Sequence, residues 1–179
     1  HSNNSFSTPI IKFEDLSQLQ NDIVVISGGK GSHIYEYLRR DNIDEANKKI
    51  EVFRKAFDED FLLEVQKTNR IDELDYFKNV IPLSIEKGIP VIATNDILFS
   101  SKDDYEIHET KVCINTGKTL NDPNREKYFS DEQYFKSPKE MIELFKNFSC
   151  LVDNTNEVAK KCNVSLKTKG YFLPEYPVP

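Results

Sequence analysis

The chain has 179 residues, and its 38% hydrophobic content with 12 Phe and 8 Tyr is enough apolar material for one packed domain. Its formal net charge of −6 argues against a surface dedicated to nucleic acid, which needs clustered Lys and Arg, and favours a protein partner or a small ligand. The sequence has no run of roughly 20 apolar residues, and Cys113, Cys150 and Cys162 match no zinc or redox spacing. We therefore expect a cytoplasmic protein with free thiols.

Three short apolar segments are predicted as β-strands. Residues 23–27 form a continuous run rich in β-branched side chains that ends at two glycines, as in a strand buried on both faces. Residues 61–66 and 90–95 have the same character, and each follows a longer helical pattern. This alternation of strands and helices predicts an α/β fold with parallel strands.

The glycine-rich loop after the first strand is Gly28-Gly-Lys-Gly-Ser32. Backbone amides at such a position can bind a phosphate group. The spacing is neither G-x-G-x-x-G nor a Walker loop, so we interpret the loop as a tight turn that uses the backbone freedom of glycine.

Helices are predicted between the strands. Asp44 is available as the N-cap of a helix that extends to Phe57. A second helical pattern covers residues 72–87 and contains Pro82, which predicts a kink or a restart at that residue. Gly88 is expected to end this helix.

The last part of the chain reads as short helices and turns. Ser137-Pro-Lys-Glu140 has the capping-box arrangement, with proline at the first helical position. Residues 152–162 predict a further helix, and the proline-rich residues 171–179 predict an extended linker.

Two carboxylates stand at the carboxyl ends of predicted parallel strands, which is the active-site side of α/β barrels. Glu64 lies late in the second strand and Asp96 directly follows the third. Carboxylates there could bind divalent cations, but His1, His33 and His108 are scattered singly, so a ligand cluster is incomplete. Two interpretations of Asp96 stay open: a helix cap or loop hydrogen-bond acceptor, and a metal ligand. His108 is likewise either a half-buried, hydrogen-bonded histidine or a functional one.

The segment Ile89-Pro-Val-Ile-Ala-Thr-Asn-Asp96 resembles a motif of the PHP domain in bacterial DNA polymerase III alpha subunits. Other segments follow in the order and spacing of that family, so the resemblance covers nearly all of the chain after Asp22. These segments are Val25–Gly29, Leu62–Glu64, His108-Glu109, Thr116–Pro123, Ser137–Phe145, Asn154-Thr155, Lys161–Val164 and Tyr171–Pro174.

The resemblance implies a partial, distorted barrel of parallel strands with outer helices, followed by short helices. It divides the chain into a tag or flexible N-terminus (1–9), the last strands and helices of the barrel (10–100), a helical part (101–170) and an extended linker toward the polymerase palm (171–179). The family's opening strand carries a His-x-His pair that this sequence lacks, so we expect the first strands to be absent. The exposed sheet edge then predicts a dimer or a domain swap of the isolated fragment.

The resemblance also bears on metal binding. In the metal-binding PHP domains, histidines stand where this chain has Thr68 and Leu98, and leucine cannot bind a metal. Asp96 is therefore interpreted as the remnant of a degraded metal site, and we assign no catalytic or cofactor-binding residue.

The enteric-type alpha subunits, which this chain resembles at both positions, imply a role without phosphoesterase activity. The domain would support the fold and dock the proofreading exonuclease subunit. DNA and Mg²⁺ would be bound by other domains of the parent polymerase. Two alternatives stay open: a metal-dependent phosphoesterase, acting as exonuclease or pyrophosphatase, and an unrelated barrel fragment. The second is tested by whether the three predicted strands are adjacent and parallel.

Overall fold

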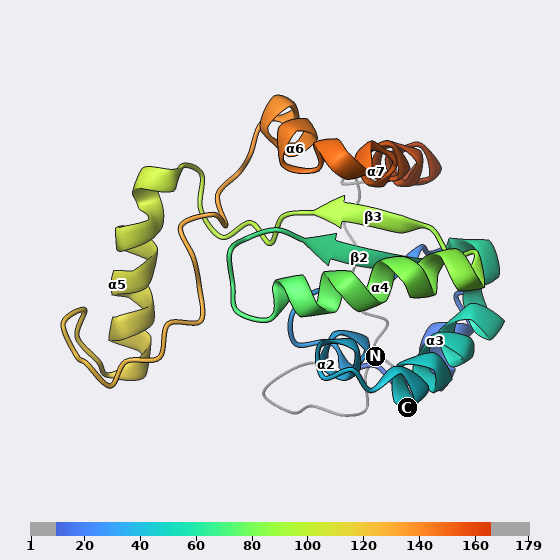
Figure 1. Cartoon of the computed structure of the whole chain (residues 1–179), viewed down its shortest axis with the longest axis horizontal. Helices are drawn as coiled ribbons and strands as arrows, with labels where there is room; N and C mark the ends of the chain where they lie inside the picture. Colours follow the sequence, from blue (N-terminus) through green and yellow to red (C-terminus); the bar gives the residue numbers. More distant parts are fainter. Residues whose placement is uncertain (1–9, 166–179) are drawn as a thin grey trace, which may run out of the picture.

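The computed structural model describes residues 10–165, where the chain folds around a three-stranded parallel sheet in the order β1-β2-β3 (Figure 1). The strands are β1 (Val25–Ile26), β2 (Phe61–Gln66) and β3 (Val91–Thr94). The predicted α/β class with adjacent parallel strands is confirmed. The described sheet is open, and its three strands do not close into a barrel.

The described part of the chain contains seven α-helices. They are α1 (Phe13–Ser17), α2 (His33–Arg39), α3 (Ile43–Phe57), α4 (Glu73–Lys87), α5 (Tyr105–Thr116), α6 (Pro138–Leu144) and α7 (Ser149–Lys161), with short 3-10 turns at Asp58–Asp60, Lys102–Asp104 and Lys146–Phe148. Within residues 10–165, no helix is both long enough and apolar enough to cross a bilayer. The predicted tail 1–9 and the linker 171–179 lie outside the described residues.

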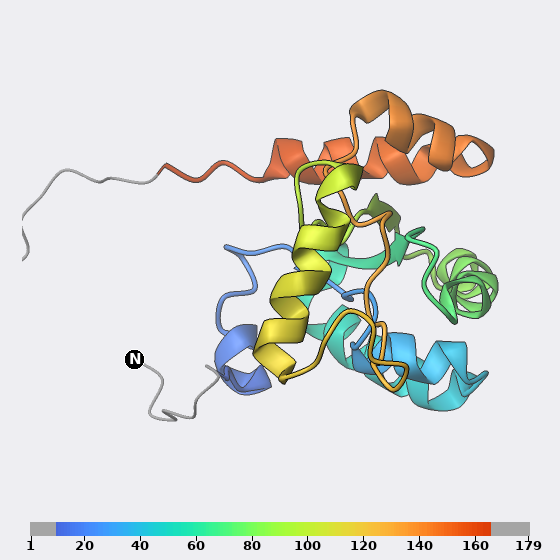
Figure 2. The same cartoon turned by 90° about the vertical axis from the view of Figure 1, so that its left-hand side faces the viewer.

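The hydrophobic core lies between the sheet and helices α2, α3 and α4 (Figures 1 and 2). Side chains alternate between the two faces of a strand, so Leu63 and Val65 of β2 point to the same side as Val91 and Ala93 of β3. The helices contribute buried residues to this cluster, among them Leu38, Ile50 and Val80.

The outer edge of β3 is covered by α7. Asn154 Nδ2 donates a hydrogen bond to the carbonyl oxygen of Val91 at 2.8 Å, and Thr155 Oγ1 donates to that of Ala93 at 3.0 Å. Side chains of a helix thus satisfy acceptors that a neighbouring strand would otherwise bind.

Two details of the predicted helices are wrong. The N-cap of α3 is Asn42, whose Oδ1 accepts the backbone N–H of Glu45 at 3.4 Å, and Asp44 lies inside the helix. Pro82 does not restart the helix, because α4 runs as one helix from Glu73 to Lys87. Pro82 lies on the exposed side of α4.

Other predictions are confirmed, and one is corrected. Gly88 ends α4 with a positive φ of 64°, and Ser137 with Glu140 forms the capping box of α6. Strand β1, however, is shorter than expected and is not buried on both faces, since Ile26 is 38% exposed. Val25 packs against the hydrophobic core, whereas Ile26, on the opposite face, does not belong to it.

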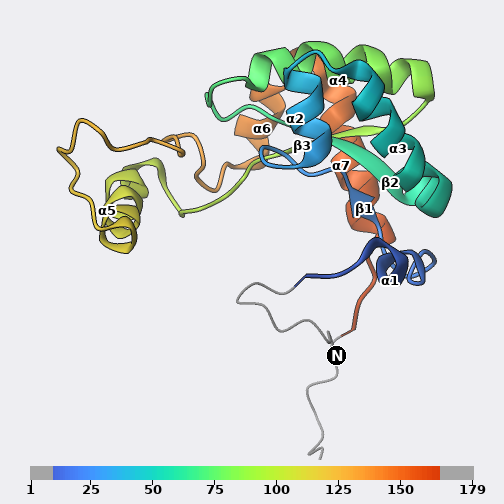
Figure 3. The same cartoon turned by 90° about the horizontal axis from the view of Figure 1, so that it is seen from below.

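An arm, residues 101–129, stands apart from the sheet and carries α5 with the loop that follows it (Figure 3). Inside the arm, the Glu109 carboxylate pairs with the Arg125 guanidinium, and both side chains are nearly fully buried. Two short segments join the arm to the body: Leu98 N–H donates to the Gln133 carbonyl at 2.9 Å, and Phe135 N–H donates to that of Phe99 at 3.0 Å.

Candidate functional site

The carboxyl ends of the parallel strands bring polar side chains to one edge of the sheet. Gln66 of β2 is in register with Thr94 of β3, and Asp96 follows two residues later. Glu64 lies one pleat before Gln66 on the same face. The sequence prediction that Glu64 and Asp96 share this edge is consistent with the strand order.

Glu64 is buried, with 9% of its surface exposed. One of its carboxylate oxygens, Oε1, accepts hydrogen bonds from Gln66 Nε2 at 2.8 Å and from the Thr94 hydroxyl. Two neutral donors therefore replace the water that the carboxylate loses on burial.

The glycine-rich loop after β1 packs against this edge. Gly28 has a φ of +78°, which confirms the predicted tight turn. A Cβ atom on Gly29 would lie 2.5 Å from Gln66 Oε1, so only glycine fits beside that side chain as it stands. Ser32 closes the turn by accepting the backbone N–H of Tyr35 at the start of α2.

Arg70, in the loop after β2, is the hub of the site. Its side chain is only 7% exposed. All three nitrogens of its guanidinium donate hydrogen bonds: Nη1 to Asp96 Oδ2 at 2.8 Å, Nη2 to Gln66 Oε1 at 2.7 Å, and Nε to Thr68 Oγ1 at 2.8 Å. The planar, permanently charged guanidinium suits such a fan of acceptors.

Glu73, at the first turn of α4, completes the pairing of Arg70. Its Oε1 lies 3.2 Å from Arg70 Nε and accepts the Thr68 hydroxyl at 2.5 Å, while its Oε2 accepts the Thr68 N–H at 2.7 Å. The Glu73 side chain is 7% exposed, so this is a buried ion pair with both carboxylate oxygens satisfied.

Asp96 is the most accessible member of the site, with a side chain 41% exposed. Besides Arg70, its Oδ2 accepts Gln133 Nε2 at 3.0 Å. Gln133 follows the arm in sequence and is fully buried. Asp96 thereby links the end of β3 to the segment that returns from the arm.

Two tyrosines lie behind the site. The rings of Tyr35 and Tyr76 stack with centroids 4.5 Å apart, and the Tyr76 hydroxyl donates to the Glu64 carbonyl at 2.7 Å. Burial, followed by the nearby Glu73 carboxylate, raises the pKa of Tyr35 to about 12. Burial also raises the pKa of Tyr76, so both hydroxyls keep their protons at neutral pH.

The histidines do not join this site. His33 is exposed at the start of α2. His108 is half-buried in the arm between the rings of Phe99 and Phe129, and its Nδ1 has no hydrogen-bond partner among the described residues. His1 lies outside the described residues.

Thr68 and Leu98, where the resemblance places histidines in metal-binding members, differ in their surroundings. Thr68 is fully buried and bonded to Glu73, whereas Leu98 is 39% exposed. Across residues 10–165, no three or more His, Cys, Asp or Glu side chains are grouped so that they could hold a metal ion.

Arg70, Glu73 and Gln133 were not among the residues predicted from the sequence. The contact of Arg70 with Asp96 joins residues 26 positions apart, and that of Gln133 with Asp96 spans 37 positions, so neither has a local pattern. The available signal was a cationic residue in the loop after a strand that carries Glu64 near its carboxyl end.

The fold and the site together define an α/β protein segment with a parallel sheet whose carboxyl edge is closed by an ionic network. No family model matches the chain. It is 37% identical over 170 residues to DNA polymerase III subunit alpha of Pseudomonas fluorescens, which covers 95% of the chain and 14% of that protein. It is 36% identical over 169 residues to the same subunit of Escherichia coli, and this match covers 94% of the chain and 15% of that protein.

The chain is thus homologous to a region of DNA polymerase III subunit alpha. It spans about a seventh of the length of these relatives. Haemophilus influenzae DNA polymerase III subunit alpha is 32% identical over 169 residues, again 94% of the chain.

Proposed function

We propose that this chain is the later part of a PHP domain in the catalytic alpha subunit of a bacterial replicative DNA polymerase, and that it serves there as a structural and docking domain without catalysis of its own. The observation that carries the proposal is the Arg70 guanidinium bound among the acceptors at the carboxyl edge of the sheet.

A metal ion, which the metal-binding PHP domains would hold at this edge, does not fit this arrangement. A divalent cation bound by Asp96 would stand beside a guanidinium 2.8 Å from the same carboxylate oxygen. Like charges so close repel, and the two cations would compete for the same carboxylate oxygen. The carboxylates of Glu64 and Glu73 also have partners already. Glu64 accepts hydrogen bonds from Gln66 and Thr94, and Glu73 binds Arg70 and Thr68. We therefore derive no hydrolytic step at this edge.

A structural role follows from what the network connects. Arg70 joins the end of β2, the first turn of α4 and the end of β3 in one cluster. Gln133 attaches the segment that returns from the arm. The Arg70 guanidinium holds together the loops that meet at this edge of the sheet. In metal-binding proteins, a bound metal ion can stabilise the fold in the same way.

The remaining proposals rest on the homologous alpha subunits and on the PHP resemblance. The parent protein would add deoxynucleotides to a primer in the cytoplasm, with Mg²⁺ and DNA held by domains outside this chain. The PHP domain would bind the proofreading exonuclease subunit of the same replicase.

The catalytic part is tested with the complete alpha subunit that contains this segment, supplied with Mn²⁺ and with Zn²⁺. We expect no bound metal in the segment and no release of phosphate from a phosphodiester or pyrophosphate substrate. Stoichiometric metal together with hydrolysis that Asp96→Ala abolishes would restore the phosphoesterase alternative.

The docking part needs a separate experiment. The complete alpha subunit is bound to its exonuclease subunit, and the 179-residue chain is added in excess. Displacement of the exonuclease subunit is expected. A complex that is unaffected by a chain whose circular dichroism shows it to be folded contradicts docking through this segment.

A further inference from the structure

The arm, residues 101–129, has an interior of its own. Its buried ion pair joins the Arg125 guanidinium to the Glu109 carboxylate, and these side chains are 8% and 3% exposed. Cys113 of α5 is also only 3% exposed. The hydrophobic core of the body, as far as the structure describes it, contains no residue of the arm. The packing of the arm therefore depends on contacts within the arm.

The polar contacts between the arm and the body lie at the base of the arm. In the part of the chain that the structure describes, the ion pairs and hydrogen bonds that leave the arm all come from Lys102. This lysine binds the carboxylates of Asp131 at 3.1 Å and Glu132 at 2.5 Å, just after the arm ends. Before the arm begins, the ring of Phe99 lies beside that of His108, with centroids 5.5 Å apart. A unit that is attached at one end can turn about that end.

The segment that returns from the arm is fastened to the carboxyl edge of the sheet by two side chains. The Ser130 hydroxyl donates to the carbonyl oxygen of Thr68. Gln133 Nε2 donates to the carbonyl oxygen of Asp96 at 3.2 Å and to its Oδ2 at 3.0 Å. We call Ser130 and Gln133 the clamp. Both of its attachment points, Thr68 and Asp96, are also bound by Arg70, so the ionic network fixes the base of the arm.

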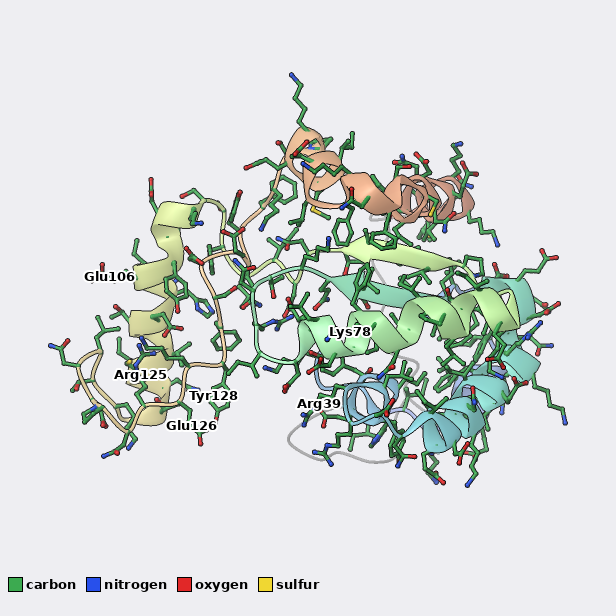
Figure 4. The ribbon with its side chains drawn as sticks, in the orientation of Figure 1. Arg39, Lys78, Glu106, Arg125, Glu126 and Tyr128 are labelled. Atoms are coloured by element: carbon green, nitrogen blue, oxygen red, sulfur yellow. The ribbon has the colours of Figure 1, made fainter. Side chains whose placement is uncertain are left out.

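The arm lies in front of the carboxyl ends of the strands. Figure 1 shows α5 beyond the arrowheads of β2 and β3, and in Figure 2 the same helix stands before the sheet. Glu106 near the base and Arg125 near the far end mark the length of the arm in Figure 4. A rotation of the arm about its base therefore changes how far it covers the edge that carries Asp96.

We propose that the arm is a hinged lid over the carboxyl edge of the sheet and that the clamp holds this lid in one position. When the clamp opens, the arm turns as a folded unit. Ser100 and Ser130 stand where the chain enters and leaves the arm, and small residues of this kind can absorb the change in backbone torsion angles. Because Arg70 holds both attachment points of the clamp, the ionic network sets the position of the lid. A partner that binds the turned arm shifts the equilibrium toward the open position.

Double electron–electron resonance of the 179-residue chain measures the position of the arm. One spin label is placed on Cys150 of α7, which is exposed, and the other on Ile114→Cys of α5, where the native side chain is 76% exposed. Cys162→Ser removes the second exposed thiol, and Cys113 is buried. With the clamp intact, we expect one narrow distribution of distances between the two labels.

Gln133→Glu should open the clamp. It replaces the donor Nε2 by a carboxylate oxygen beside the Asp96 carboxylate, and like charges at this distance repel. The mean distance between the labels should shift, and the distribution should broaden. Gln20→Glu is the matched control, because it makes the same chemical change at an exposed glutamine outside the clamp, and it should leave the distribution unchanged. Ser130→Ala removes the other bond of the clamp and should shift a smaller part of the distribution.

Amide hydrogen exchange distinguishes a turning lid from an unfolded arm. The amides of α5 are bonded within the helix, so their exchange in Gln133→Glu should stay within about twofold of the rate in the unsubstituted chain. Faster exchange throughout α5 would mean that the arm unfolds, and it overturns the proposal. A distance distribution that is unchanged in both clamp variants, when circular dichroism shows that they are folded, overturns it as well. Ser130→Ala decides the question if Gln133→Glu does not fold.

Discussion

Arg70 Nη1 lies 2.8 Å from Asp96 Oδ2, although the two residues differ sharply in exposure: the arginine side chain is 7% accessible and the aspartate 41%. A buried cation thus holds a carboxylate at the water boundary. The deeper half of the same network, Arg70 with Glu73, is inaccessible on both sides. The two halves should respond differently to substitution.

Replacing Arg70 by Met is expected to destabilise the fold by about 3–5 kcal/mol, because the Glu73 carboxylate would stay buried without its cation. Urea unfolding followed by circular dichroism measures the change. Arg40→Ala is the control: the Arg40 side chain is 66% exposed, and its pair with Glu36 at 3.2 Å lies at the surface. That substitution should change the free energy of unfolding by less than about 1 kcal/mol. Equal effects of both substitutions would show that Arg70 is not the hub.

Replacing Asp96 by Ala should cost about 1 kcal/mol or less, because the Asp96 side chain is 41% exposed and Arg70 keeps its contacts with Thr68, Glu73 and Gln66. It should leave the rate of phosphodiester hydrolysis unchanged from background with Mn²⁺ supplied, because the cation that Asp96 binds is Arg70. The urea midpoint and a hydrolysis assay on the same preparation measure both effects. A metal-dependent rate that disappears in this variant would contradict the structural role of Asp96.

Replacing Thr155 by Val removes the hydroxyl that caps the Ala93 carbonyl but keeps the shape of the side chain. The carbonyl at the buried edge of β3 then loses a partner, which should cost about 1–3 kcal/mol. Amide hydrogen exchange should also become faster in β3. Thr110→Val is the control, because Thr110 bonds only to a carbonyl of its own exposed helix and should have little effect. Unchanged exchange in β3 would argue against capping by α7.

Glu140 predicts a pH dependence. The Tyr134 hydroxyl donates to its carboxylate at 2.6 Å, and this bond, followed by those from Ser137, lowers the pKa of Glu140 to about 2 from 4.5. A carboxyl with a lowered pKa stabilises the folded state fully above its unfolded pKa and loses that contribution as the pH falls toward 2.

The stability difference between the native chain and Glu140→Gln should therefore be constant near neutral pH and shrink below the unfolded pKa of 4.5. Unfolding curves across this range measure it. Tyr134→Phe should narrow the pH range over which this stability difference changes, because it removes the hydrogen bond that contributes most to the lowered pKa of Glu140. A difference that does not change with pH would exclude the carboxylate as its origin.

The local elements of this fold were predictable because they depend on neighbouring residues. Short stretches of sequence determine the capping box of Ser137 and Glu140 and the end of α4 at Gly88. Parallel pairing followed from the strand and helix alternation. The N-cap of α3 was misplaced by two residues, since Asn42 and Asp44 are both competent caps and the choice depends on packing.

The site was predictable only in outline. That Glu64 and Asp96 come to one edge follows from parallel strands. Which cation meets them does not, because Arg70 reaches Asp96 across 26 positions through tertiary structure alone. The carboxylates at a strand end look the same in sequence whether a metal ion or an arginine neutralises them. Telling the two apart required the geometry of the loop after β2.

The side chains that bind the free carbonyl groups of β3 determine at which edge the sheet can accept a further strand. Asn154 and Thr155 already bind carbonyl oxygens on one border, so an incoming strand there would first have to displace α7. The opposite border, beside Val25 and Ile26, has no strand against it among the described residues. An additional strand, from a longer polypeptide or from another molecule, is therefore expected next to β1, where it would not have to break the hydrogen bonds between α7 and β3.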